Sequence, residues 1–278
     1  DISFYPLLFL KIDQKKIIFS ITDFQTNRLL KLFFVNLLSL KAIYYFVGFL
    51  HCLFVESFVF KKIKKLHMYS SEDEFKMKKL FSYKNLISIP NFNESREINK
   101  PQNKINFSNE NKILLMGDFN QLELFEGLKK FKKLKYFDKF QKNYSFVFKG
   151  NYNDRVKSQI RKGFSNCIFE NQWIDSSLYH DYLDSFRLLL FLDSIDFGLS
   201  NRVTDALQSK SLIVGFKNAF TGFPVKNFNE VILISNFFDL VYAYNLKSIT
   251  RNEIINKANI LSKNYKLELV KTRWNKIL

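Results

Sequence analysis

The stretch that decides the fold runs from Arg187 to Val225 and reads RLLLFLDSIDFGLSNRVTDALQSKSLIVGFKNAFTGFPV. An apolar run of strand length, residues 188–192, leads into a polar turn that contains Gly198. A short amphipathic helix is predicted over residues 202–210, and a second apolar run, 212–216, follows it. A strand, turn, helix and strand in this order place a ligand at the carboxyl edge of a parallel sheet, with a helix N-terminus aimed at it.

Two side chains of the predicted helix suit a nucleotide. Arg202 and the backbone amides of residues 201–203 form an anion site, because a helix N-terminus and a fixed guanidinium act on the same charge. Asp205 lies one helical turn further on, where a carboxylate can accept two hydrogen bonds from the vicinal diol of a ribose. The alternative for Asp205 is an ordinary exposed acid in a first helical turn, which adds roughly a few tenths of a kcal/mol to the helix.

The residues around this helix resemble the nucleotide-sugar signature of GT-B glycosyltransferases of the group 1, or family 4, type. That signature reads glycine, an aliphatic residue, two polar residues, Lys or Arg, two spacers, Glu, Ala and an aliphatic residue, and residues 198–207 follow its order. A buried strand and then Thr221-Gly222 come next, as in that family. Asp205 stands where the family has Glu, Lys210 where it has Gly, and Leu212 where it has Pro.

The resemblance implies a glycosyltransferase that moves a sugar from a nucleotide-diphosphate-sugar donor to a hydroxyl of a glycan, polysaccharide or lipid-linked acceptor, with retention of configuration. It implies no cofactor and no metal, because such enzymes stabilise the departing diphosphate with basic residues and helix dipoles rather than with a cation. Acceptor-orienting residues of the early loops would precede Asp1, so no catalytic residue is assigned. The chain begins with Asp1 rather than Met and is expected to be the later part of a longer polypeptide. It is also expected to be cytoplasmic and peripheral on the inner face of the membrane.

The donor site is expected where the strand ends of the second domain meet. Gly117 and Asp118 follow the first strand, where bare backbone suits a diphosphate, although a plain strand-to-helix turn reads the same way. Lys149 after the second strand either neutralises phosphate or is surface charge, and Trp173 after the third either contacts the base or packs. The full predicted donor-binding set is Gly117, Asp118, Lys149, Trp173, Gly198, Leu199, Asn201, Arg202 and Asp205.

Residues 112–250 are predicted to form a nucleotide-sugar-binding Rossmann-like domain with six strands and five intervening helices. The strands are expected at residues 113–116, 145–148, 167–170, 188–192, 212–216 and 231–234, and the helices at 121–140, 153–162, 177–186, 202–210 and 236–246. A helix pair over 251–278 carries Trp274 and resembles the family's closing helices, which pack back on the first domain.

Residues 1–90 read as a partial, acceptor-side Rossmann-like domain, and the polar stretch 91–111 reads as a linker. Strands are expected at 16–22, 66–69 and 86–89, with one long helix over 26–65 and a shorter one ending near Phe81. Ser71 and Glu74 form a predicted capping box that opens the shorter helix. The predicted fold class is therefore α/β: a GT-B fold of two Rossmann-like domains with parallel sheets, the first incomplete at its N-terminus.

Residues 42–60 are close to the length needed to span a bilayer, because their apolar run of nineteen positions is interrupted only by His51, Glu56 and Ser57. Glu56 costs roughly a few kcal/mol on insertion scales, so a buried or interfacial helix is preferred to a spanning one. The lysines that flank the segment suit an anionic membrane surface, or they are simply solvated charges at a helix end.

The composition excludes general disorder and favours an anionic partner, with 47% hydrophobic residues and a net charge of +17. Part of that charge is equally explained as the codon bias of an AT-rich genome. Two cysteines give no disulfide framework, which fits a reducing compartment. One alternative function is a basic nucleic-acid-binding protein, suggested by the lysines of residues 129–135, although no nucleic-acid motif accompanies them and the preferred partner is a nucleotide sugar. The other alternative is a noncatalytic GT-B-like protein.

Overall fold

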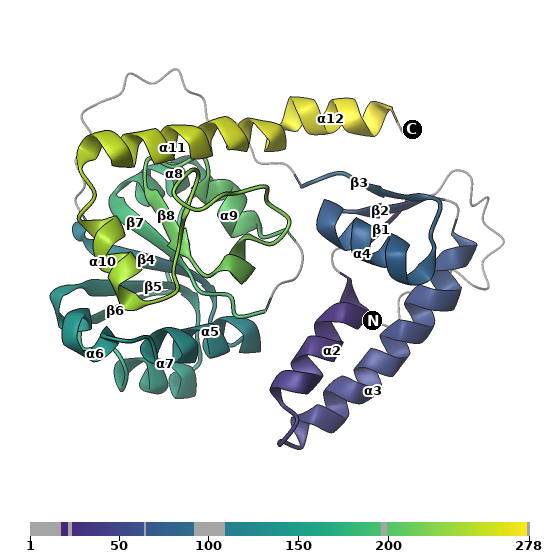
Figure 1. Ribbon diagram of the computed structural model, residues 1–278, viewed down its shortest axis with the longest axis horizontal. Helices are drawn as coiled ribbons and strands as arrows, with labels where there is room; N and C mark the ends of the chain where they lie inside the picture. The colour runs from purple at the N-terminus through teal and green to yellow at the C-terminus, as the bar shows by residue number, and fades with distance from the viewer. Residues whose placement is uncertain (1–17, 22–23, 64, 92–108, 196–198, 277–278) are drawn as a thin grey trace. The chain divides into compact units, whose positions relative to one another are not determined.

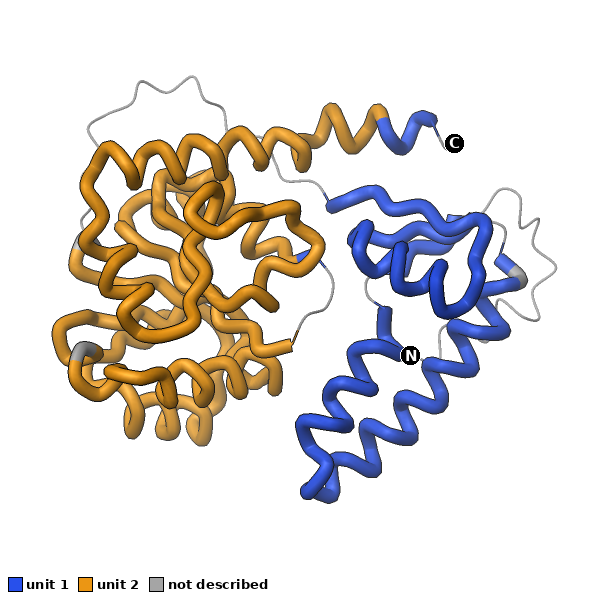
Figure 2. The backbone as a smooth tube through the Cα atoms, in the orientation of Figure 1, with its two compact units in different colours: residues 1–91, 197–199, 273–278 blue, residues 92–196, 200–272 orange. Residues whose placement is uncertain are grey.

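The computed structural model describes residues 18–21, 24–63, 65–91, 109–195 and 199–276. The chain divides into two compact units (Figure 2). Unit 1 comprises residues 1–91 with 197–199 and 273–278, and unit 2 comprises residues 92–196 with 200–272.

Unit 2 is built on a parallel sheet of six strands in the order β6-β5-β4-β7-β8-β9. The strands are β4 (Asn109–Asp118), β5 (Ser145–Asn151), β6 (Cys167–Glu170), β7 (Phe186–Phe191), β8 (Leu212–Gly215) and β9 (Ile232–Leu233). The chain enters at the middle strand, moves outward to β6, and then crosses back to continue on the other side through β7. This is the doubly wound topology that the alternation of strand and helix patterns predicted.

Apolar residues cover both faces of this sheet, which is why its strands read as continuous hydrophobic runs. Leu188, Leu189 and Leu190 of β7 are all buried, although neighbours along a strand point to opposite faces. One face packs against an aromatic core in which Phe131 lies against the rings of Phe146, Phe164 and other phenylalanines. Burial of so much aromatic surface stabilises the sheet whose edge carries the loops.

Helices cover both faces of the unit 2 sheet (Figure 1). Helices α5 (Leu122–Lys132), α6 (Phe137–Phe140) and α7 (Asp154–Arg161) lie on one face, and α8 (Ser176–Asp184), α9 (Asn201–Ala206) and α11 (Ser248–Ser262) on the other. The remaining helices are α10 (Phe237–Tyr244) and α12 (Leu267–Asn275), with short 3-10 turns η5 (Gln141–Asn143), η6 (Lys217–Phe220) and η7 (Lys263–Tyr265).

Two of the predicted helices in unit 2 have different limits. The single helix expected over 121–140 is broken, because Tyr136 adopts a left-handed conformation with φ of 71° between α5 and α6. The helix expected over 202–210 ends at Ala206, where the Ser209 hydroxyl donates to the Ala206 carbonyl oxygen at 2.7 Å. The Asp184 carboxylate then accepts from the Lys210 amide at 2.7 Å, so side chains replace the helical pattern there.

Unit 1 contains a three-stranded parallel sheet in the order β1-β2-β3. Its strands are β1 (Phe19–Ile21), β2 (Leu66–Met68) and β3 (Leu86–Ser88), and helix α4 (Ser71–Phe81) joins the last two. His67 is buried in this sheet, with Nδ1 at 2.9 Å from the Ser20 hydroxyl and Nε2 at 2.8 Å from the Ile89 carbonyl oxygen. The Trp274 ring, at the end of α12, lies 4.6 Å from the His67 ring between centroids.

The long helix predicted over residues 26–65 is wrong. The chain instead forms α2 (Gln25–Val35), turns, and continues as α3 (Lys41–Phe54), followed by a π-helical turn η3 (Val55–Val59) and a 3-10 turn η4 (Phe60–Lys62). At the turn the side-chain amide of Asn36 donates to the Leu32 carbonyl oxygen at 2.8 Å, and the Ser39 hydroxyl donates to the Asn36 carbonyl oxygen at 3.0 Å. Asn and Ser side chains compete with the helical hydrogen bonds in this way and end the first helix.

Two further predictions about unit 1 need correction. The cap of α4 lies one residue earlier than predicted, because the Ser70 hydroxyl accepts from the Asp73 amide at 3.2 Å. Of the two alternatives for the helix after Lys41, buried or interfacial, the buried one is wrong, since Ala42 is the only buried residue of α3. Residues Lys41–Val59, with a mean hydropathy of 1.6, are long and apolar enough to cross a membrane by length and composition.

Candidate functional site

The site is positioned by the crossover of the chain in unit 2. Successive strands run outward from β4 to β6 on one side, and the chain returns to the other side through β7. The loops after β4 and β7 therefore leave the sheet in opposite directions, which makes their neighbouring carboxyl ends the topological switch point of the sheet. Met116 and Gly117 lie at the end of β4, and Asp193 follows the end of β7.

Arg202 spans these two strand ends. Its Nη1 donates to the Met116 carbonyl oxygen, and its Nη2 donates to Asp193 Oδ1 at 2.8 Å. The two contacts come from different strands, so the guanidinium is held in place at the switch point of the sheet. A guanidinium has five N–H donors, and these contacts use two of them.

Gly117 is required for the close approach of Arg202. Its φ is +148°, a backbone conformation that side-chain-bearing residues rarely adopt, and a Cβ built there would lie 2.4 Å from Arg202 Nη1. Gly150 is opposite it in the β4–β5 register and has a φ of +139°. A Cβ at Gly150 would lie 2.0 Å from the Gly117 carbonyl oxygen, so both strand ends present bare backbone.

Asp205 faces Tyr179, a residue of α8. The Tyr179 hydroxyl hydrogen-bonds the Asp205 carboxylate and lies 3.7 Å from Met116 Sδ, which brings both side chains to the end of β4. Burial raises the pKa of Asp205 from 3.8 to about 6, and the hydrogen bond from Tyr179 opposes this rise. Burial, and next the charge of Asp205, raise the pKa of Tyr179 above its usual range, so the phenol keeps its proton as a donor.

Helix α9 is short, and Arg202 is its second residue. Ser200 is its N-cap, and the Ser200 carbonyl oxygen accepts from the Val203 amide at 3.1 Å and the Thr204 amide at 3.2 Å. Because a six-residue helix has a small dipole, the fixed charge of Arg202 is the stronger part of this predicted anion site. Leu199 is half-buried, and the predicted site residue Gly198 lies outside the described residues.

The other predicted residues lie further along the same edge. Asp118 Oδ1 accepts from the Asn120 amide at 3.1 Å, which closes the turn after β4. Lys149 donates to the Gln172 carbonyl oxygen, and its Nζ lies 5.5 Å from the Tyr182 ring centroid. Trp173 follows β6 and is 93% exposed, so the alternative that it packs into the protein is wrong.

The structure thus groups Gly117, Arg202 and Asp205 around Met116 and adds two residues that the sequence analysis missed. Asp193 could have been found, because it directly follows the buried strand whose carboxyl end borders the switch point. Its Oδ2 is buried and has no hydrogen-bond partner among the described residues. No sequence signal pointed to Tyr179, because it is one residue of an ordinary amphipathic helix.

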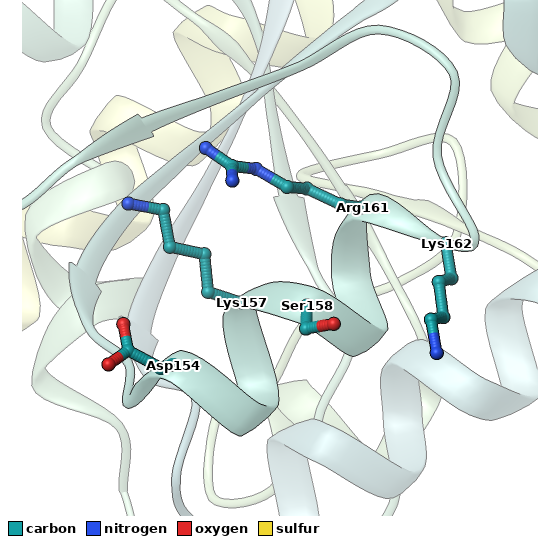
Figure 3. Close-up of a pocket in the computed structure, with 5 residues that line it drawn as sticks. All are labelled: Asp154, Lys157, Ser158, Arg161 and Lys162. Atoms are coloured by element: carbon teal, nitrogen blue, oxygen red, sulfur yellow. The ribbon is translucent and has the colours of Figure 1, made fainter.

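Two other features of the described residues bear on where a ligand could bind. No group of three His, Cys, Asp or Glu side chains that could hold a metal ion occurs in the described part of the chain. A shallow hollow beside α7 is lined by Asp154, Lys157, Ser158, Arg161 and Lys162 (Figure 3). The Lys157 Nζ and the Arg161 guanidinium lie 5.3 and 5.4 Å from the Phe169 ring centroid, so these cations cover an aromatic side chain of β6.

A doubly wound parallel sheet with a fixed guanidinium at its switch point defines unit 2 as a Rossmann-like domain. No protein-family model matches the chain, and no curated protein matches its sequence. Solved structures do resemble it, and they show that the fold of the chain is that of the GT-B glycosyltransferases.

Three solved structures illustrate the likeness. Staphylococcus aureus TarM, in complex with UDP among other ligands, matches with a TM-score of 0.60 and 17% identity over 78% of this chain and 44% of TarM. Anabaena Alr3699/HepE, in complex with UDP and glucose, matches with a TM-score of 0.62 and 11% identity over 81% and 66%. A glycosyltransferase from Rickettsia africae matches with a TM-score of 0.59 and 12% identity over 81% and 65%. The chain therefore spans about half to two thirds of the length of these proteins.

Proposed function

We propose that unit 2 binds a nucleotide-diphosphate sugar at the switch point of its sheet, and that the protein transfers the sugar to a hydroxyl acceptor. The observation that carries the proposal is the bridge that Arg202 makes between the Met116 carbonyl oxygen and Asp193. It fixes a cation beside the bare backbone of Gly117, where the topology of the sheet favours a ligand.

Arg202 is proposed to bind the diphosphate. A guanidinium forms charge-assisted hydrogen bonds to phosphate oxygens, and an arginine that is already held in place loses little side-chain entropy when it binds. Asp193 lowers the net positive charge at this point, but it also keeps the guanidinium oriented. The departing diphosphate is expected to be stabilised by this fixed charge without a bound cation.

Asp205 is proposed to bind the ribose. Its carboxylate lies beside Arg202 on the same short helix, and Tyr179 holds it by a hydrogen bond. A carboxylate has two oxygens with about four lone-pair sites, so it can accept from Tyr179 and from both hydroxyls of a diol. The proposed reaction breaks the bond between the anomeric carbon and the diphosphate and forms a bond to the acceptor oxygen, with retention of configuration.

The nucleotide to test first is UDP, because the matched structures of TarM and HepE each contain it. Titration calorimetry of the full chain with UDP is expected to show binding, with GDP and ADP as comparison nucleotides. The substitutions Asp205→Ala and Arg202→Ala are each expected to weaken binding by about 1–3 kcal/mol, because each leaves a polar group of the ligand unpaired.

A matched control is Asp154→Ala, which removes an exposed first-turn carboxylate from α7 and is expected to leave UDP affinity unchanged. Equal affinity of the Asp205→Ala variant and the unchanged protein would remove Asp205 from the site. A product assay with UDP-sugar donors separates an enzyme from a noncatalytic relative, since the latter would bind UDP and release no sugar.

A further inference from the structure

The hairpin of α2 and α3 in unit 1 exposes an apolar surface that the donor site does not use. Five residues of α3 and η3 form this surface, here called the outer face: Ile43, Val47, Leu50, Phe54 and Phe58. Their spacing of three or four residues puts them on one side of the helix. Ile43 is 65% exposed and Phe58 is 63% exposed, and at the hairpin turn Leu38 is fully exposed. A continuous apolar surface of this kind marks an interaction site.

The charges of the hairpin indicate what covers the outer face. Residues 25–55 contain no Asp or Glu, and the acid that follows them, Glu56, is buried. Exposed lysines stand at both ends of the outer face, Lys41 before it and Lys61 after it. An apolar helix face with basic residues at its ends fits an anionic lipid surface, where the lysines meet headgroups and the apolar side chains enter the acyl boundary.

A second copy of the chain fits this face less well. Two hairpins that met through their outer faces would bring basic residues together without any exposed acid on this segment to neutralise them. The net charge of +17 on each copy adds to that repulsion.

The hairpin also favours a helix that lies along the lipid surface over one that crosses the bilayer. The other side of α3 packs against α2, where a Cβ at Gly48 would be 3.4 Å from the Leu29 side chain. Helix α2 carries Arg28 and Lys31, and a crossing α3 with α2 attached would bring those two charges into the hydrocarbon core.

We propose that the outer face of the α2–α3 hairpin docks on a membrane surface rich in anionic lipid. The proposal rests on unit 1 alone and is independent of the donor site of unit 2. It predicts that binding needs both the apolar residues of the outer face and the lysines at its ends.

The experiment is cosedimentation of the full chain with vesicles of phosphatidylcholine alone and of phosphatidylcholine mixed with phosphatidylglycerol. The unchanged protein is expected to bind the mixed vesicles and to be released by high salt. The double substitution Val47→Ser with Leu50→Ser is expected to lower the partition coefficient about tenfold or more, because two apolar side chains no longer enter the lipid. Lys41→Gln with Lys61→Gln is expected to weaken binding to the mixed vesicles alone.

The matched control is Ile249→Ser with Ile260→Ser, which removes two exposed isoleucines of α11 and is expected to leave vesicle binding unchanged. Circular dichroism and urea denaturation of each variant report whether it remains folded. Vesicle binding by the Val47→Ser, Leu50→Ser variant equal to that of the unchanged protein would overturn the proposal. The proposal would also be overturned if the unchanged protein did not bind mixed vesicles. A dimer in sedimentation velocity that this variant abolishes would overturn it too.

Discussion

Single residues at the carboxyl edge of the unit 2 sheet carry the proposed donor site. Arg202 is held by a carbonyl oxygen from one strand and a carboxylate from the loop after another. A lysine could not replace it in both contacts, because an ammonium is a point charge without the planar fork of a guanidinium. The environment of Asp205 disfavours its charge, because burial raises the pKa of the carboxyl group.

The raised pKa of Asp205 predicts that nucleotide affinity depends on pH. Burial raises the pKa of this carboxylate to about 6, and its protonated form accepts fewer hydrogen bonds from a ribose. UDP affinity measured by calorimetry is therefore expected to fall as the pH falls through about 6. The Asp205→Asn variant is expected to bind more weakly at neutral pH and to lack this dependence. The same pH profile in the variant would contradict the role given to Asp205.

Gly150 at a strand end and Gly48 within helix α3 predict opposite effects of an alanine substitution on stability. Gly150→Ala places a Cβ 2.0 Å from the Gly117 carbonyl oxygen at a φ of +139°. It is expected to lower the free energy of unfolding by about 2–4 kcal/mol, measured by urea denaturation. Gly48→Ala is the control, because a Cβ there meets only a flexible leucine side chain within a helix, and it is expected to add about 0.5–1 kcal/mol. Equal stability of the two variants would refute this assignment.

At the scale of elements, a buried carboxylate joins the two arms of the α2–α3 hairpin. Glu56 of η3 accepts from the Gln25 amide at 2.9 Å and the Thr26 amide at 3.2 Å, so it caps the first turn of α2. Burial raises the pKa of Glu56 from 4.5 to about 7, although the hydrogen bonds from Thr26 and Gln25 lower it. The cap therefore joins two helices that the sequence pattern had merged into one.

Glu56 predicts a pH dependence of the stability of unit 1. Its pKa is higher in the folded protein, so the folded state holds the extra proton between pH 4.5 and about 7 and loses stability as the pH rises through that range. Glu56→Gln is expected to remove about 1–3 kcal/mol of this change, because an amide does not titrate. Urea denaturation at the two ends of the range measures the difference. A variant that loses stability with pH as steeply as the unchanged protein would show that another group is responsible.

At the scale of the whole molecule, each unit has its own parallel sheet and its own apolar core. The two tryptophans have different environments, since Trp274 lies against His67 in unit 1 whereas Trp173 is 93% exposed after β6. The end of α12 is thereby part of unit 1 (Figure 2). Aromatic side chains that are packed contribute to stability, and those in solvent do not.

The tryptophans predict a localised effect on stability. Trp274→Ala is expected to lower the free energy of unfolding of unit 1 by about 1–3 kcal/mol, because it removes a packed aromatic side chain. Amide hydrogen exchange is expected to accelerate in β2 and to stay unchanged in β7. Trp173→Ala is the control and is expected to alter neither strand. Unchanged exchange in β2 of the Trp274→Ala variant would show that the contact with His67 contributes nothing.

The sequence by itself determined the order of the strands and helices in unit 2 and most of their limits. Those elements depend on apolar runs and helical periodicity, which are local properties of the chain. It also predicted that Gly117, Arg202 and Asp205 lie at one edge of the sheet, because the strand ends of a parallel sheet gather there. The break after Val35 was missed, since the side chains of Asn36 and Ser39 ended a helix that hydropathy alone would continue.

Only the tertiary structure decided which groups meet at the site and which surfaces stay open. Arg202 and Met116 are 86 residues apart in the chain, and no local pattern specifies that one donates to the other. Tyr179 reaches Asp205 because α8 and α9 lie on the same face of the sheet. The sequence left open whether α3 is buried or interfacial for the same reason: an apolar pattern records that a face avoids water, and only packing decides what, if anything, covers it.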